Sequence, residues 1–187
     1  MTTLAAIQGD GWAVIGGDSQ SSDGDGFTQL IPHGKIFENN GIVFGGAGDV
    51  RGINILQHDW SAPKVGRSNP DKFITRSLIP SMRRAFVEAG YEINKSDSSV
   101  VNNNIWLVII DCNVYRIDED YSWEKCVDNI YVAGSGESFA LGALTALDAG
   151  NVATVDEAEE IIRESIRIAI KWDAFSGGEI TTVTKCR

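Results

Sequence analysis

Short apolar runs and longer amphipathic segments follow one another along the chain in blocks. Two pairs of strand-like runs come first, at residues 3–7 and 12–16 around Gly9-Asp10-Gly11, and at residues 35–37 and 41–44 around Asn39-Asn40-Gly41. Asn or Asp followed by glycine between two apolar runs is typical of a tight hairpin turn. The chain is therefore expected to begin as antiparallel sheet.

Two helices are expected next, over residues 49–60 and 70–89. Asn69 is placed to cap the second helix, Pro70 suits its first turn, and Gly90 ends it. Pro80 lies inside this helix and is expected to kink it, because proline lacks the backbone N–H that a helix interior requires.

The second half of the chain repeats this order. The polar stretch 94–104 is expected to be a loop, followed by strands at residues 105–110, 114–118 and 130–133, the first of them apolar enough to be buried on both faces. Two more helices are expected, one over residues 138–149 with Gly150 as its C-cap and one opening at Thr154, whose spacing to Glu157 is that of a capping box. A last strand is expected over residues 179–186.

Strands, two helices, strands, two helices and a final strand favour two sheets packed together with helices outside, rather than alternating βαβ units. We therefore predict an α/β fold, a four-layer α/β/β/α sandwich. A length of 187 residues, 43% of them hydrophobic, is enough for one core. Residues 1–187 are predicted to form a single domain.

The charge balance limits the classes of partner. Lys and Arg number 16 against 26 Asp and Glu, a net charge of -10, which disfavours binding to nucleic acid or to anionic lipid. The longest strand-like apolar run, residues 105–110, is far shorter than the roughly 20 residues that cross a bilayer, so no membrane association is expected. The N-terminus lacks signal-peptide features, and Cys112, Cys126 and Cys186 show no CxxC spacing. We expect a reducing, cytoplasmic location.

Familiar motifs of hydrolases and nucleotide-binding proteins do not occur in the sequence. His33 and His58 have no GxSxG or HExxH motif beside them, and residues 9–18 lack the GxGxxG and GxxxxGK[ST] patterns. A histidine triad, a metal site and a nucleotide site are therefore unsupported, and no cofactor is expected. The groups left for chemistry are Thr, Ser, Asp and Lys side chains and the amides of clustered glycines.

Six short motifs occur in order along nearly the whole chain. They are Met1-Thr2-Thr3 before a strand, VIGGDSQ with Asp18, Gly34-Lys35-Ile36, Gly46-Ala47-Gly48, Gly134-Ser135-Gly136, and WDAFSGG with Asp173, Ser176 and Gly177. With these motifs the chain resembles the N-terminal-nucleophile hydrolases of the proteasome type, which include the peptidase subunit of the bacterial two-component ATP-dependent protease. The resemblance implies an α/β/β/α sandwich, in agreement with the order of elements.

The resemblance implies that Thr2 becomes the nucleophile once Met1 is removed. One residue then offers a hydroxyl and an α-amine whose ordinary pKa of about 8 suits a general base. Asp18 and Lys35 would form an ion pair beneath Thr2, in which the ammonium lowers the pKa of the hydroxyl and amine nearby. Without the resemblance, Thr2 is an ordinary second residue, and Asp18 and Lys35 are solvated surface residues.

The resemblance also assigns roles to the glycine-rich turn. The Gly48 N–H would donate to the oxyanion that develops during acyl transfer, and Gly46, Ala47 and Val50 would form the substrate pocket, with Gly46 leaving it open. Taken alone, Gly48 is a turn glycine between a strand and a helix.

Three further residues would surround the amine of the nucleophile and relay its protons: Ser135, Asp173 and Ser176. Taken alone, Ser135 is a helix cap, and the other two belong to the turn after a helix.

The function implied is that of a threonine-type endopeptidase that cleaves unfolded polypeptide inside a self-compartmentalised homo-oligomeric ring, with an ATP-dependent unfoldase ring as an optional partner. Ring contacts are expected from the helices at residues 49–60 and 71–89. Their bulky apolar residues Trp60, Phe73 and Ile79 lie beside the helix face that is expected to pack into the core, and they are more than that one face can bury. Two alternatives stay open: a non-catalytic ring or shell subunit that retains Met1, and an amidase for a small molecule with the same nucleophile.

Overall fold

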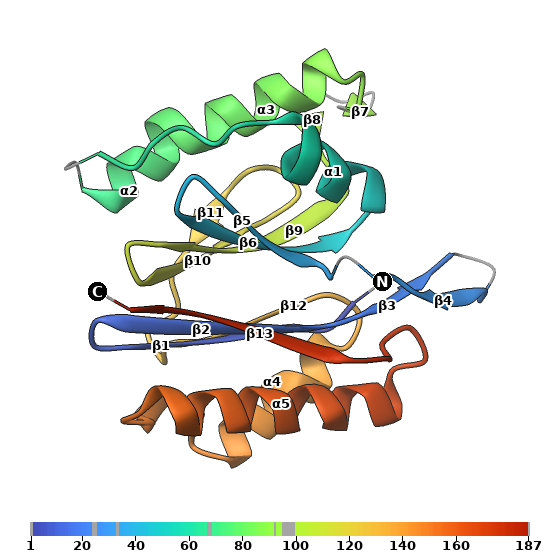
Figure 1. Ribbon diagram of the computed structural model, residues 1–187, viewed down its shortest axis with the longest axis vertical. Helices are drawn as coiled ribbons and strands as arrows, with labels where there is room; N and C mark the ends of the chain where they lie inside the picture. Colours follow the sequence, from blue (N-terminus) through green and yellow to red (C-terminus); the bar gives the residue numbers. More distant parts are fainter. Residues whose placement is uncertain are drawn as a thin grey trace.

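Two antiparallel sheets lie face to face in the middle of the molecule, and a layer of helices covers the outer face of each (Figure 1). This computed structural model describes residues 2–23, 26–32, 34–66, 69–91, 93–94 and 100–186. The predicted four-layer α/β/β/α sandwich is confirmed.

The sheets are built from the strands that the apolar runs predict. The first has the order β12-β1-β2-β13, with β1 Leu4–Gly9, β2 Trp12–Asp18, β12 Ile130–Ala133 and β13 Ile180–Cys186. The second has the order β11-β10-β9-β6-β5, with β5 Ile36–Asn39, β6 Ile42–Gly48, β9 Asn104–Ile110, β10 Asn113–Ile117 and β11 Trp123–Glu124. Both predicted hairpins form, and Asn40 and Gly41 take the positive φ angles that a type I′ turn requires.

One helical layer covers the five-stranded sheet. It consists of α1 Val50–Asn54 with a π-helical continuation Ile55–Asp59, and of α2 Pro70–Phe73, a π-helical segment Ile74–Leu78 and α3 Ile79–Glu88. The Asn69 side chain accepts a hydrogen bond from Asp71 N at 2.8 Å, and Gly90 ends α3 at a φ of 62°, as predicted. The π-helical segment Ile74–Leu78 ends just before Pro80, and its wider turn accommodates the missing N–H. The predicted kink at Pro80 stays a prediction.

The other helical layer, α4 Glu137–Ala146 and α5 Val155–Trp172, covers the four-stranded sheet. The Thr154 cap is confirmed, since its side chain accepts from Glu157 N at 3.3 Å. The prediction that Gly150 caps the preceding helix is wrong. That helix ends at Ala146, and Asp148, with a φ of 54°, turns the chain into a 3₁₀ segment, Ala149–Asn151.

Several short strands were not predicted, because they carry little apolar signal. The hairpin of β3 Gln20–Ser22 and β4 Thr28–Leu30 forms in a polar stretch, and β7 Ile93–Asn94 pairs with β8 Val100–Val101 in the expected loop. None of the helices in the described ranges has both the length and the apolar character needed to cross a bilayer.

Apolar side chains form three layers, one between the sheets and one under each helical layer. Strand β9 serves two of them, because Trp106 and Val108 point to the helices while Leu107 and Ile109 point to the other sheet. The prediction that this strand is buried on both faces is therefore confirmed.

The bulky apolar residues that were predicted to form ring contacts pack inside the molecule instead. Phe73 and Ile79 are buried in the core, and Trp60 is half-buried against it. The π-helical segments interrupt the regular helical period, so the face turned toward the sheet is wider than a strict 3.6-residue stripe.

Candidate active site

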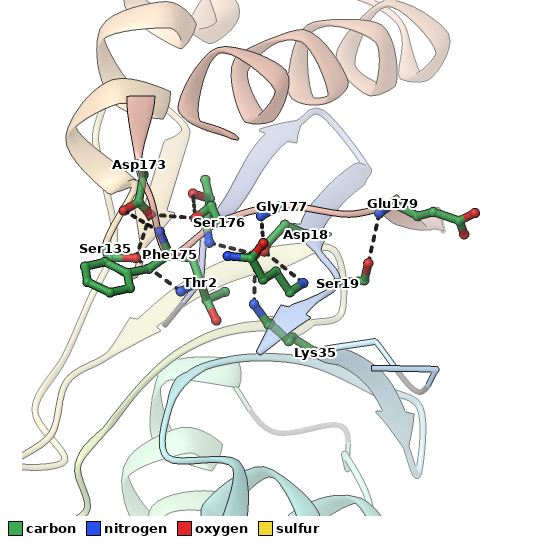
Figure 2. A network of polar contacts seen from close by, with 12 residues as sticks. Thr2, Asp18, Ser19, Lys35, Ser135, Asp173, Phe175, Ser176, Gly177 and Glu179 are labelled. Atoms are coloured by element: carbon green, nitrogen blue, oxygen red, sulfur yellow. Dashed lines mark hydrogen bonds and ion pairs between the residues drawn. The ribbon is translucent and has the colours of Figure 1, made fainter. Parts of the chain in front are cut away.

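The N-terminal end of β1 lies between the two sheets, beside the β3–β4 hairpin (Figure 1). Thr2 and Thr3 are both buried there, and they are polar residues at the start of an otherwise apolar strand. Polar groups buried in this way need partners. Two groups of side chains supply them (Figure 2).

The first group is the ion pair between Asp18, at the end of β2, and Lys35, just before β5. The Lys35 ammonium donates to Asp18 Oδ1 at 3.0 Å, and both side chains are almost fully buried. Burial lowers the pKa of Lys35, and the neighbouring Asp18 carboxylate offsets part of this effect. The sequence prediction that these residues pair is therefore matched by their placement.

Backbone amides complete the surroundings of the Asp18 carboxylate. Its Oδ1 accepts from Thr3 N at 2.8 Å, and its Oδ2 accepts from Gln20 N at 3.1 Å and from Gly177 N at 3.0 Å. These charge-assisted hydrogen bonds stabilise an ionised carboxylate in a buried position.

The second group joins the turn before α4 to the end of α5. Asp173 Oδ2 accepts from Ser135 Oγ at 2.7 Å and from Ser176 Oγ at 2.6 Å. Each serine has one hydroxyl proton, and both protons are used in this way. Ser135 Oγ is then the acceptor for Thr2 N, which lies 3.2 Å away. The chain of donors runs from Thr2 N through Ser135 to Asp173.

Thr3 connects the two groups, and sequence analysis assigned it no role. Its N–H donates to Asp18, and its Oγ1 lies 2.7 Å from Ser176 Oγ, to which it donates because the Ser176 proton goes to Asp173. The period of two along a strand is the signal that could have found it. Successive side chains point to opposite faces, so Thr3 points toward α5 when Thr2 points between the sheets.

Glycines let the turn before α4 approach Thr2 and Thr3. A side chain at Gly134, whose φ is 99°, would overlap the Thr2 carbonyl oxygen, and one at Gly136 would overlap the Thr3 hydroxyl. Gly136 N also donates to the Thr2 carbonyl oxygen at 3.4 Å. The contact of this turn with Thr2 and Thr3 therefore requires glycine at both position 134 and position 136.

A small pocket opens beside Thr2. Thr2, Lys35, Gly48 and Val50 line it, as their predicted roles require. Its other lining residues were not predicted, because they come from the β3–β4 hairpin region and from the first helical segment, where only Val50 was expected to take part: Ser21, Ile31, Ile53, Asn54 and Gln57.

Gly46 and Ala47, which were predicted to line the pocket, do not line it. A side chain at Gly46 would come within 2.7 Å of Ile53 and 2.8 Å of Trp106, so these neighbours fill the space beside the glycine. Ala47 is buried between the two sheets. Gly48 lies at the predicted strand-to-helix turn, with a φ of 135°.

Of the two histidines, only His58 lies among the described residues. His58 lies in the π-helical segment Ile55–Asp59 and does not line the pocket, and His33 lies outside the described residues. Within the described ranges, no group of three or more His, Cys, Asp and Glu side chains is arranged to hold a metal ion.

Comparison with known proteins agrees with this description. Residues 112–184 match the family model for proteasome subunits. Among solved structures, the chain is similar to Thiobacillus denitrificans BPH, with 18% identity and a TM-score of 0.81 over 99% of this chain and 98% of the other. The same protein in complex with epoxomicin matches at 17% identity and a TM-score of 0.80, with 99% and 98% of the two chains covered.

Eukaryotic HslV from Trypanosoma brucei matches over the full length of both chains, 100% of each, with 23% identity and a TM-score of 0.67. No curated protein sequence matches the chain. The resemblance to proteasome-type N-terminal-nucleophile hydrolases is thus confirmed, by a family model over residues 112–184 and by the fold over the whole chain.

Proposed function

We propose that this chain, whose fold is that of proteasome-type hydrolases, is a threonine-type endopeptidase with Thr2 as its nucleophile after removal of Met1. The observation that carries the proposal is the hydrogen bond from Thr2 N to Ser135 Oγ at 3.2 Å. Ser135 Oγ in turn donates to Asp173 Oδ2 at 2.7 Å. A nitrogen held in this way becomes a positioned α-amine when Thr2 is the first residue. Ser135 and Asp173 then stabilise its protonated form.

In the proposed reaction, the Thr2 hydroxyl attacks the substrate carbonyl and gives its proton to the Thr2 amine. The Lys35 ammonium favours the loss of this proton, and the Gly48 N–H donates to the developing oxyanion. When the peptide C–N bond breaks, the ammonium returns the proton to the leaving amine. Water then attacks the acyl-enzyme ester with the amine as base, which releases the acid and restores the hydroxyl. These steps use only groups of the chain and water.

The proposed substrate is unfolded polypeptide, cleaved inside a homo-oligomeric ring in the cytoplasm, with an ATP-dependent unfoldase ring as a further proposed partner. The pocket beside Thr2 is small, and its lining mixes apolar and amide side chains without an unpaired charge among the described residues. Such a pocket discriminates weakly between side chains. Enclosure of the site in a ring would then keep folded proteins from reaching it and being cleaved.

Intact mass and peptide cleavage test the proposal together. The native protein is expected to lack the mass of one methionine and to cleave fluorogenic peptides. Thr2→Ala is expected to fold and to retain less than about a tenth of the activity, because losing a nucleophile costs orders of magnitude in rate. Thr2→Ser, which keeps a hydroxyl, is the matched control.

Epoxomicin, which is bound by a structural neighbour of this chain, provides a second readout. We expect it to inhibit the native protein. Retention of Met1 together with no cleavage would instead identify a non-catalytic subunit, and cleavage of small amides but not of peptides would identify an amidase.

A further inference from the structure

A buried polar network contacts the turn that joins β6 to α1, two elements that follow each other directly in the fold (Figure 1). Its centre is Asn104, the first residue of β9, which pairs with Gly48 in the sheet and is fully buried. Asn104 does not line the pocket, and the proposed reaction does not use it.

Both polar atoms of the Asn104 side chain are engaged. Its Nδ2 donates to the Asp49 carbonyl oxygen at 3.0 Å, and its Oδ1 accepts from the Tyr91 hydroxyl at 2.6 Å. Tyr91 is itself buried, and burial raises its pKa, so it stays a protonated donor. The Asp49 carbonyl also accepts from Gly52 N and Ile53 N, which form the first turn of α1.

The backbone is shaped to fit this side chain. A side chain at Gly52 would overlap Asn104 Oδ1, and one at Gly48 would overlap the Asn103 carbonyl oxygen. The turn can therefore rest directly on β9 only because both positions are glycine. Arg51 closes the arrangement by donating to the Ala89 carbonyl oxygen at 2.8 Å.

We infer that Asn104, held by Tyr91, is a positioning residue that sets the Gly48–Gly52 turn against the rest of the site. This turn carries the proposed oxyanion donor, Gly48 N–H, and leads into Val50, Ile53 and Asn54 on the pocket wall. The catalytic consequence rests on the proposed function, whereas the anchoring of the turn does not.

The test compares Asn104→Leu with Asn39→Leu. Asn39 is a matched control, because its Nδ2 also donates to main-chain carbonyls of the same helical segment, at Leu56 (3.1 Å) and Trp60 (2.9 Å), beyond the first turn. Tyr91→Phe is a milder variant that removes the hydroxyl, which donates to Asn104 Oδ1 at 2.6 Å and also lies 3.2 Å from the Asn102 carbonyl oxygen. Amide hydrogen exchange of residues 48–53, thermal unfolding and kcat on a fluorogenic peptide are measured for all three.

For Asn104→Leu we expect exchange at residues 51–53 to rise at least about tenfold and kcat to fall at least about tenfold, as a displaced oxyanion donor requires. Tyr91→Phe is expected to change both in the same direction by less. Asn39→Leu is expected to lower the unfolding temperature without either local change.

Unchanged exchange in folded Asn104→Leu, or equal changes in Asn39→Leu, would overturn the inference. If exchange rises but kcat stays within about twofold, the anchoring of the turn stands and its catalytic consequence is wrong. A wild-type protein without peptidase activity would refute the proposed function, and the exchange data alone would then decide whether Asn104 anchors the turn.

Discussion

Thr2 and Thr3 are neighbours in the chain, but their side chains lie in different surroundings. Thr2 lines the pocket, whereas the Thr3 hydroxyl is buried against Ser176 on the side of α5. Strand geometry separates the two, because adjacent side chains point to opposite faces. Thr2 thus borders the pocket, whereas Thr3 holds the strand against Asp18 and Ser176.

Thr3→Val is expected to cost about 1 kcal/mol of unfolding free energy, the usual net value of one buried neutral hydrogen bond. It should lower peptide cleavage by less than about tenfold, since Asp173 keeps both serine donors. Urea unfolding and peptide hydrolysis measure the two effects, with Thr3→Ser as control. A complete loss of activity in folded Thr3→Val would mean that Thr3 itself acts in the reaction.

The buried ion pair of Lys35 and Asp18 is expected to make activity and stability respond to pH in opposite directions. Burial lowers the pKa of Lys35, so between that value and the ordinary lysine value of about 10.4 the unfolded chain binds more protons than the folded chain. The contribution of Lys35 to stability therefore rises with pH through this window. Activity is expected to fall in the same window, because the Lys35 ammonium that we propose assists the Thr2 hydroxyl loses its proton.

The measurement is kcat between pH 7 and 11, beside thermal unfolding of the same samples. We expect the alkaline limb of the kcat profile to lie below about 10.4. Activity that persists undiminished beyond an ordinary lysine pKa would show that the Lys35 charge is not required.

At the scale of elements, α5 links the packing of a helical layer to the geometry of the site. Gly16 in β2 lies directly beneath Ile162, so that a side chain there would overlap it, and α5 then runs to Asp173 at its C-terminal end. The contact of this helix with the sheet therefore sets how far Asp173 lies from Thr2. Neighbouring α4 contains a glycine, Gly142, with no atom within 4 Å of an added side chain.

Gly16→Ala and Gly142→Ala are expected to change stability with opposite signs. The first forces α5 away from the sheet and should cost about 1–3 kcal/mol, as overpacked cores do, and it should lower activity by displacing Asp173. The second should stabilise α4 by about 0.5–1 kcal/mol through helix propensity, with activity unchanged. Denaturant unfolding and peptide cleavage check both. If both substitutions changed the unfolding free energy in the same direction, the packing described for α5 would be contradicted.

For the molecule as a whole, the exposed apolar side chains are candidates for contacts with other proteins. They do not include the residues expected from sequence, because Phe73 and Ile79 are buried. Those that remain exposed lie mainly on the β3–β4 hairpin and at the α4–α5 layer: Phe27, Leu30, Phe139, Leu141, Leu147 and Trp172. Apolar patches on a surface commonly mark contacts with other proteins.

We predict a ring or stacked double ring with six or seven subunits per ring, with an open spiral as the lesser alternative. Light scattering at micromolar concentration is expected to give a mass that is a multiple of 20.2 kDa. An inactive monomer would indicate activation by assembly. A 20.2 kDa monomer that cleaves peptides would contradict enclosure of the site.

The order of layers and most boundaries of the longer helices and strands follow from local sequence patterns. Hairpin glycines, apolar runs and helix caps act over a few residues, so Asn69, Gly90 and Thr154 were placed correctly. The resemblance carried by short motifs also named residues that the fold brings together, such as Asp18 with Lys35 and Ser135 with Asp173.

Which residues come into contact across the fold depends on the packing of the complete molecule. Ile53 fills the space beside Gly46, Thr3 bridges Asp18 and Ser176, and Asn104 supports the turn at Asp49. The partners of Thr3 and Asn104 lie far apart in the chain, and the approach of Ile53 to Gly46 depends on how α1 packs against the sheet. Close packing and the need to pair every buried polar group act between such partners, and they are satisfied only once all four layers are in place.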